Sequence, residues 1–320
     1  MPTVAVTDFN FPDLDLEKSV LSSDGYEVIS GQCRTVDEVR SLCEDADAVI
    51  TQFAPVRADA IDAMRQAKVI VRYGIGYDNV DIQAAKERSI PVCNIPDYCI
   101  DEVADHTLAF VLSLTRQVIP NHTFVQQGKW GLATPLSELR TMRDLTVGVV
   151  GFGRIGREVL MRLAPFKCQR LVYDPVVDPK SIQSVGCQPV TLEELLANSD
   201  VVSLHCPSND ATRRMIRRET IGAMKPNAML INLARGDLVD TDALVEALQS
   251  KKIAGAALDV FAPEPLPESH PLRSMPNVVT ASHIASASPK AVRTLRESAA
   301  KLAAMALRGE KLPSVVNGVA

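Results

Sequence analysis

The 320-residue chain has few of the features that mark membrane, secreted or nucleic-acid-binding proteins. No uninterrupted apolar run reaches the roughly 20 residues of a membrane-spanning helix. No charged leader with an apolar segment precedes the first strand-like run, at 4–7. Basic residues do not exceed acidic ones, and a net charge of -5 leaves no basic surface for nucleic acid or an anionic membrane. We therefore expect a cytoplasmic protein that binds neither.

Disulfide and metal chemistry also find little support. The seven cysteines are odd in number and scattered, and no two form the Cys-x-x-Cys pair of zinc sites and redox motifs. Such thiols do not build the disulfide framework of a small secreted domain. We expect reduced cysteines and no bound metal.

What the sequence does contain is an alternation of strand-like and helix-like segments. Strands are predicted at 4–7, 26–29, 48–51, 69–71 and 91–94, and again at 147–150, 171–173, 201–205, 229–233, 254–258 and 278–281. Strands that alternate with helices build parallel sheets covered by helices. With 46% hydrophobic residues, the chain is long enough for two cores. The sequence therefore predicts an α/β protein of two domains.

Some helix boundaries are marked by their capping residues. Thr35 and Glu38 have the spacing of a capping box. Ser288, followed by proline, is typical of a helix N-cap, and Gly309 of a helix stop. The polar stretch 120–144 is predicted to be irregular.

A glycine-rich segment joins the predicted strand 147–150 to a helix pattern. It reads Gly151-Phe-Gly-Arg-Ile-Gly156, and Asp174 closes the next strand. A pyrophosphate needs bare backbone amides, a close approach and a helix start, which this arrangement supplies. A carboxylate at Asp174 would bind ribose hydroxyls and repel a 2′-phosphate. We predict a dinucleotide-binding domain that uses NAD rather than NADP.

Three side chains in the second half of the chain could interconvert a 2-keto acid and a 2-hydroxy acid. Arg235 follows the strand 229–233, where a guanidinium could hold a carboxylate with two donors. His283 follows the strand 278–281 and could transfer a proton near neutral pH. Glu264 lies in a proline-rich loop, from which it could orient the imidazole and stabilise its charged form. On spacing alone, Glu264 and His283 could equally be structural.

Several segments resemble one enzyme family, over nearly the whole chain. They are Val149-Val-Gly-Phe-Gly-Arg-Ile-Gly156, Leu204-His-Cys-Pro207 with Thr212, Leu230-Ile-Asn-Leu-Ala-Arg-Gly236, Ala257-Leu-Asp-Val-Phe261 with Glu264-Pro265, and Ser282-His-Ile284. The chain is similar to the D-isomer-specific 2-hydroxyacid dehydrogenases, a group that includes phosphoglycerate, glyoxylate/hydroxypyruvate and D-lactate dehydrogenases and the C-terminal-binding-protein corepressors. The resemblance implies that Arg235, Glu264 and His283 are catalytic.

The resemblance also implies how the domains divide. It implies a flavodoxin-like substrate domain at 1–100, completed by 297–320, and a Rossmann-type NAD-binding domain at 101–296. A dimer arm is expected near 119–145. Trp130, the single tryptophan, falls in this arm, where it would anchor an interface, enter the neighbour's site or be an ordinary core residue.

Cofactor and substrate contacts are implied residue by residue. Asp259 matches the residue that holds the nicotinamide carboxamide. The other implied cofactor contacts are Gly151, Gly153, Arg154, Ile155, Gly156, Asp174, His205, Pro207, Thr212, Leu233, Ala234 and Ala285. Gly74, Ile75 and Gly76 resemble the loop whose backbone amides receive the substrate carboxylate, with an ordinary turn as the alternative.

Three positions bear on which member of the family the chain resembles. Ser282 stands where many relatives have proline, and Leu233 where many have a smaller or polar residue, so nicotinamide packing could differ in detail. Glu264 disfavours a formate dehydrogenase, because those enzymes carry glutamine there.

The sequence thus predicts an NAD(H)-dependent D-2-hydroxyacid dehydrogenase, a cytoplasmic homodimer with His283 as acid and base. The specific substrate stays open among glyoxylate, hydroxypyruvate, phosphohydroxypyruvate and branched keto acids. A phosphorylated substrate would need further cations, for which the candidates are Arg57, Arg72 and Arg116. The alternative is an NADH-sensing, corepressor-like scaffold with vestigial catalysis.

Overall fold

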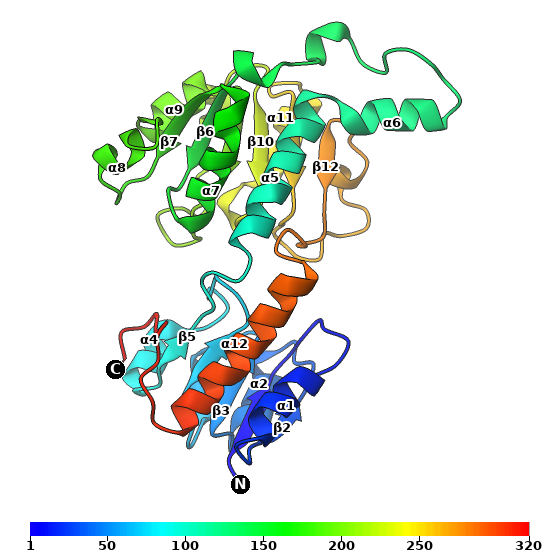
Figure 1. Ribbon diagram of the computed structural model, residues 1–320. Coiled ribbons are helices and arrows are strands. Elements are labelled where there is room, and N and C mark those ends of the chain that lie inside the picture. Colours follow the sequence, from blue (N-terminus) through cyan, green and yellow to red (C-terminus); the bar gives the residue numbers. More distant parts are fainter. Residues whose placement is uncertain (320) are drawn as a thin grey trace. The chain divides into compact units, whose positions relative to one another are not determined.

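The computed structural model describes residues 1–319, which form two compact units (Figure 1). Unit 1 contains residues 1–98 together with the chain from Ser288 onward, and unit 2 contains residues 99–287. Ala320, the last residue of the expected substrate domain, lies outside the described residues. Residues 288–296 were expected in the NAD-binding domain but lie in unit 1, where the helix that Ser288 caps packs on the first sheet through its residues from Leu295 onward.

Unit 1 is built on a five-stranded parallel sheet. Its strands are β1 (Thr3–Val6), β2 (Glu27–Ser30), β3 (Ala48–Thr51), β4 (Ile70–Arg72) and β5 (Val92–Cys93). They lie in the order β2-β1-β3-β4-β5. This is the strand order of flavodoxin, which confirms the predicted flavodoxin-like fold.

Helices cover both faces of this sheet. One face carries α1 (Asp15–Ser22) and α12 (Pro289–Leu307), and the other carries α2 (Val36–Cys43), α3 (Ala58–Ala63) and α4 (Ile82–Glu87). Successive strand residues point to opposite faces. Val4 therefore packs in the cluster that contains Leu295 of α12, while the next residue, Ala5, packs with Val39 of α2. Each face buries its own apolar layer.

The predicted helix boundaries of unit 1 are confirmed. Both hydrogen bonds of the Thr35–Glu38 capping box are present at the start of α2. Ser288 accepts a hydrogen bond from the backbone N–H of Ala291 at 3.0 Å. Gly309 follows the C-cap of α12 with φ of 72°, a conformation that glycine adopts at little cost.

Unit 2 is built on a seven-stranded parallel sheet. Its strands are β6 (Thr146–Val150), β7 (Gln169–Tyr173), β8 (Gln188–Pro189), β9 (Val201–Leu204), β10 (Met229–Asn232), β11 (Gly255–Leu258) and β12 (Val278–Thr280). The order β12-β11-β10-β9-β6-β7-β8 is that of the Rossmann fold with one strand added, which confirms the predicted fold class. The prediction missed β8, because this short edge strand has no apolar run.

Helices also cover both faces of the second sheet. One face carries α5 (Ile100–Thr115) and α7 (Arg154–Leu163), and the other carries α9 (Leu192–Asn198), α10 (Arg218–Ala223) and α11 (Thr241–Gln249) (Figure 1). A short helix, α8 (Pro179–Gln183), precedes β8. Buried strand residues such as Val150 and Leu230 pack with α11 in one apolar cluster. This core supports the edge where the candidate residues lie.

The stretch 120–144 was predicted to be irregular, but its first residues belong to helix α6 (Val118–Gln126). Gln117, with φ of 52°, separates α6 from α5. Pro120 stands in the first turn of α6, where its missing N–H costs no hydrogen bond.

Membrane spans and metal clusters are not found in the described part of the chain. None of the helices within residues 1–319 is long and apolar enough to cross a membrane. The same residues contain no group of three or more His, Cys, Asp or Glu side chains placed to hold a metal ion.

Candidate active site

The expected cofactor and catalytic residues of unit 2 follow the strands of one parallel sheet, so they lie along its carboxyl edge. Gly151 follows β6, Asp174 follows β7, His205 follows β9, Leu233 to Arg235 follow β10, Asp259 follows β11, and His283 and Ala285 follow β12. Ligands of open α/β sheets bind at this edge.

The glycine loop after β6 has the shape of a phosphate cradle. A Cβ atom on Gly151 would lie 2.8 Å from the His205 carbonyl, and one on Gly156 would lie 2.1 Å from the Gly151 carbonyl oxygen. Packing within the protein therefore demands both glycines. A Cβ on Gly153 would meet nothing within 4 Å, and α7 begins at the next residue, Arg154. This open backbone at a helix start fits the close approach of a pyrophosphate.

The carboxylate of Asp174 is held by backbone N–H groups. Its Oδ2 accepts from Phe152 of the glycine loop at 2.8 Å, and its Oδ1 accepts from Val176 at 3.0 Å and Val177 at 3.2 Å. These bonds fix an anion beside the glycine loop. The arrangement fits ribose hydroxyls and opposes a 2′-phosphate.

The loop after β9 presents a neutral histidine and a closed turn. Burial lowers the pKa of His205 to about 4, so its ring is uncharged at neutral pH. Its Nε2 lies 2.8 Å from Ser203 Oγ. Thr212 Oγ1 donates to the carbonyl of Pro207 at 2.6 Å and accepts from the N–H of Asn209 at 2.9 Å. Thr212 thus closes the turn that Pro207 begins.

His283 and Glu264 meet although they come from separate loops. Nδ1 of His283 lies 2.8 Å from Oε2 of Glu264, and Glu264 Oε1 accepts from the N–H of Phe261 at 2.7 Å. Burial alone would raise the pKa of Glu264. The hydrogen bond and charge of His283, the Phe261 N–H and the charge of Arg235 outweigh burial and hold this pKa below its usual value. The pair therefore favours an ionised carboxylate beside the imidazole.

Arg235 stands in a turn that the side chain of Asn232 holds at both ends. Asn232 Nδ2 donates to the Arg235 carbonyl at 2.8 Å, and its Oδ1 accepts from the N–H of Ala234 at 3.1 Å. The guanidinium Nη1 of Arg235 donates to the Ala234 carbonyl at 2.8 Å. Asn232 was not among the expected site residues. A polar residue at the end of a buried strand was the signal that could have revealed it.

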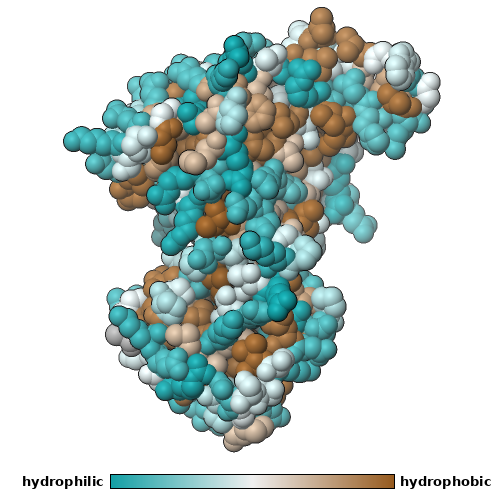
Figure 2. Space-filling view, viewed as in Figure 1, coloured by the Kyte–Doolittle hydropathy of each residue, from teal (hydrophilic) through white to brown (hydrophobic). Residues whose placement is uncertain are grey.

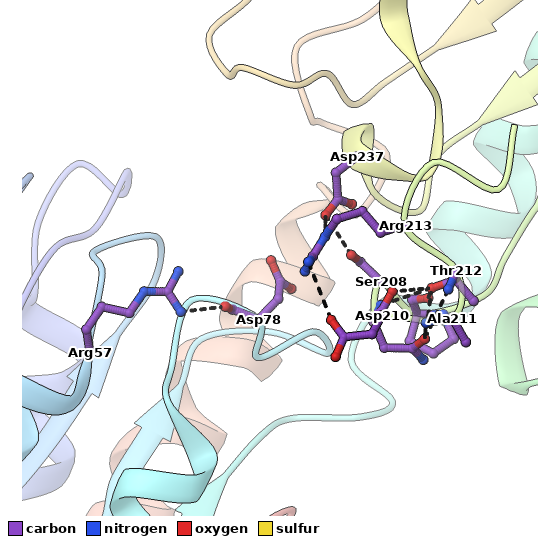
Figure 3. A network of polar contacts seen from close by, with 10 residues as sticks. Arg57, Asp78, Ser208, Asp210, Ala211, Thr212, Arg213 and Asp237 are labelled. Carbon is purple, nitrogen blue, oxygen red and sulfur yellow. Dashed lines mark hydrogen bonds and ion pairs between the residues drawn. The ribbon is translucent and has the colours of Figure 1, made fainter. Parts of the chain in front are cut away.

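A second bracing contact joins the loop after β9 to the turn after β10 (Figure 3). Ser208 Oγ donates to Asp237 Oδ2 at 2.7 Å. Arg213 lies between two carboxylates, with Nε 3.4 Å from Asp237 and Nη1 3.5 Å from Asp210. The sequence analysis did not identify these residues. Ser208 and Arg213 lie close to Asp237 only because β9 and β10 are neighbours in the sheet.

In unit 1, Gly74 to Gly76 follow β4. Gly74 has a φ of 145°, which residues with a Cβ atom rarely adopt, so this position favours glycine. The Gly74 N–H donates to the Arg72 carbonyl at 2.8 Å. The residue before the loop, Tyr73, donates a hydrogen bond from its hydroxyl to the buried Glu17 at 2.9 Å. Burial raises the pKa of Tyr73. The turn is thus anchored to its own unit.

Comparison with known proteins identifies the family. Residues 108–285 match the model of the D-isomer specific 2-hydroxyacid dehydrogenase, NAD binding domain. The chain belongs to the D-isomer-specific 2-hydroxyacid dehydrogenase family. It is an oxidoreductase that uses NAD to interconvert a 2-keto acid and a D-2-hydroxy acid, as predicted.

Relatives agree with this assignment along most of their length. The chain is 38% identical over 277 residues to a glyoxylate reductase of Korarchaeum cryptofilum, which covers 86% of this chain and 83% of that protein. A crystal structure of a protein from Thermus thermophilus is 36% identical, with a TM-score of 0.87 and coverage of 98% and 99%. A D-lactate dehydrogenase from Aquifex aeolicus, complexed with NAD and lactic acid, is 30% identical, with a TM-score of 0.87 and coverage of 96% of both chains.

Proposed function

We propose that His283, Glu264 and Arg235 carry out the acid–base chemistry of this dehydrogenase. The observation that carries the proposal is the 2.8 Å contact between His283 Nδ1 and Glu264 Oε2, at the sheet edge that also holds the Arg235 turn. NADH, when bound, supplies the hydride. His283 donates a proton through Nε2 to the carbonyl oxygen, because Nδ1 is engaged by Glu264, and Arg235 stabilises the negative charge of the substrate.

Cofactor and substrate are proposed to be held by the residues that the resemblance names. The glycine loop would receive the pyrophosphate, and Asp174 the adenosine ribose. His205, Pro207, Thr212, Leu233, Ala234, Asp259 and Ala285 would line the rest of the cofactor site. In the loop Gly74, Ile75 and Gly76, the Gly74 N–H already has an internal acceptor, which leaves those of Ile75 and Gly76 for a substrate carboxylate.

A small unphosphorylated keto acid is the proposed substrate, with glyoxylate as the first choice. Relatives at 38% identity are named glyoxylate reductases. Each arginine considered for a phosphate already contacts its own chain. Arg57 donates to the Asp78 carbonyl at 3.1 Å (Figure 3), Arg116 donates to the Arg140 carbonyl at 3.2 Å, and Arg72 is buried with its guanidinium over the Phe53 ring.

The arm is proposed to form a homodimer interface. Trp130 is 91% exposed, and Leu136 is 71% exposed. Figure 2 shows apolar surface in this part of unit 2. Large apolar side chains in such a patch favour association with a second copy.

A cytoplasmic location is also proposed. All seven cysteines are free thiols, which suits a reducing compartment. Cell fractionation would test it, since recovery with membranes or outside the cell would contradict it.

Initial rates of NADH oxidation across a panel of 2-keto acids test the proposed function, with NADPH as the cofactor control. We expect turnover with glyoxylate and weaker turnover with phosphohydroxypyruvate. NADH binding without turnover on any keto acid would instead support the corepressor-like scaffold. The contact between His283 and Glu264 and the relatives named glyoxylate reductases do not favour that alternative.

A further inference from the structure

One residue receives three consecutive backbone N–H groups of the His283 loop. The carbonyl oxygen of Asp259 accepts from His283 at 2.8 Å. Its side-chain Oδ1 accepts from Ile284 at 2.9 Å, and its Oδ2 accepts from Ala285 at 2.9 Å. Two successive N–H groups thus converge on one carboxylate, as they do on an anion in a backbone nest.

The backbone of His283 needs such support. Its φ is 56°, in the left-handed region that side chains with a Cβ atom rarely occupy. Residues held in sparsely populated backbone conformations persist when the surrounding structure over-determines them. The three bonds to Asp259 supply that constraint directly, because they fix the backbone on both sides of the histidine's Cα atom.

Asp259 is itself fixed inside unit 2. It is 1% exposed, and its own N–H donates to the Asn232 carbonyl at 3.0 Å. Asn232 also holds the Arg235 turn through its side chain. A continuous line of hydrogen bonds through the buried residues Asn232 and Asp259 therefore joins the backbone of Arg235 to that of His283.

We propose that Asp259 is a positioning residue that holds the His283 loop in its left-handed conformation and so places the imidazole against Glu264. The inference rests on the proposed role of His283. This role is additional to the contact with the nicotinamide carboxamide that the family resemblance implies for Asp259. Each carboxylate oxygen accepts one N–H of the loop and keeps a second lone pair, so a contact with the carboxamide is compatible with this role.

Asp259→Asn tests this by removing the charge and one of the two acceptors, since its NH2 group must face an N–H. We expect kcat to fall about 10²-fold, the cost of misplacing a catalytic group by about 1 Å. KM for the keto acid should change less than about threefold. Asp240→Asn is the matched control, because Asp240 also accepts a backbone N–H, from Ala243, away from this loop. It should leave kcat unchanged.

The decisive comparison repeats Asp259→Asn in a His283→Ala background. If Asp259 acts through the imidazole, the second substitution should change the residual rate by less than about threefold. An equal loss in both backgrounds would show that Asp259 acts independently of the imidazole and would overturn the proposal. An unchanged kcat in the single variant would overturn it as well.

A readout that does not need turnover separates this inference from the proposed function. The imidazole resonances of His283, assigned by NMR through His283→Ala, should shift in Asp259→Asn even if no keto acid is reduced. Unchanged resonances would count against positioning. If Asp259→Asn fails to fold, Asp259→Ser takes its place, and failure of both would show a role in folding instead.

Discussion

His283 Nδ1 and Glu264 Oε2 lie 2.8 Å apart, a direct link between two loops that leave different strands of the same sheet. The pKa of Glu264 is held below its ordinary 4.5. A carboxyl group whose pKa is lower in the folded state stabilises the fold above its unfolded pKa, and this contribution is lost as the pH falls through the folded value. The carboxylate is therefore present beside His283 throughout the neutral range.

Glu264→Gln should lower kcat by about 10- to 100-fold. The amide can still accept a hydrogen bond from Nδ1 but carries no charge, and a hydrogen bond to a charged partner contributes roughly 1.5–3 kcal/mol. Initial rates at saturating NADH measure the loss. Glu268→Gln, in the same loop and exposed, should leave kcat unaltered. Wild-type kcat in Glu264→Gln would show that the charge has no catalytic role.

His283→Ala should reduce kcat by roughly 10²- to 10⁴-fold, the usual contribution of a general acid. NADH affinity, measured by fluorescence titration, should stay near the wild-type value. The exposed His122 provides the control, since His122→Ala should retain full turnover. Loss of NADH binding together with turnover would mean that His283 serves the structure instead.

Asp174→Asn should shift the cofactor preference toward NADPH. The amide removes the charge that opposes a 2′-phosphate, and loss of a charge-assisted bond to the ribose should lower kcat/KM for NADH by about 10- to 100-fold. The ratio of kcat/KM for NADH and NADPH is the measurement. Asp178→Asn, which alters the cap of α8, should not change that ratio. An unaltered ratio in Asp174→Asn would refute the role of Asp174.

Acid should destabilise the protein partly through His205. Its folded pKa of about 4 lies below the ordinary value of 6.5, so the unfolded chain binds the proton first and stability falls as the pH drops from 6.5 toward 4. This contributes about 1 to 2 kcal/mol of loss between pH 7 and 5.

Urea unfolding of His205→Gln at both pH values tests this, because the variant should lose less stability than wild type. His122→Gln, at an exposed site, should behave as wild type. An identical pH dependence in all three proteins would show that His205 does not titrate in this way.

The combined substitutions Trp130→Ser and Leu136→Ser should convert a dimer to a monomer. They remove two exposed apolar side chains from the arm, and burial of each in an interface contributes roughly 1.5–3 kcal/mol. Light scattering coupled to size exclusion gives the mass. Val176→Ser changes an 89% exposed side chain outside the arm and should leave the mass unaltered. A wild-type monomer would refute the dimer.

Much of the fold and of the candidate site could be predicted from short-range patterns of residue types in the sequence. Thr35 and Glu38 determine a helix start through bonds three residues apart. Gly156 packs against the carbonyl of Gly151, five residues earlier in the chain. Because such interactions are short in sequence, residue types and spacing are sufficient to predict them.

Sequence alone determined the α/β class, the dinucleotide loop and the loops that hold Arg235, Glu264 and His283. Only the tertiary structure decided that His283 adopts a left-handed backbone, that Asp259 receives the next two N–H groups, and that Asn232 and Ser208 brace the neighbouring turns. The physical reason is distance along the chain. These contacts depend on the order of strands in the sheet and on the paths of loops, which no local pattern specifies.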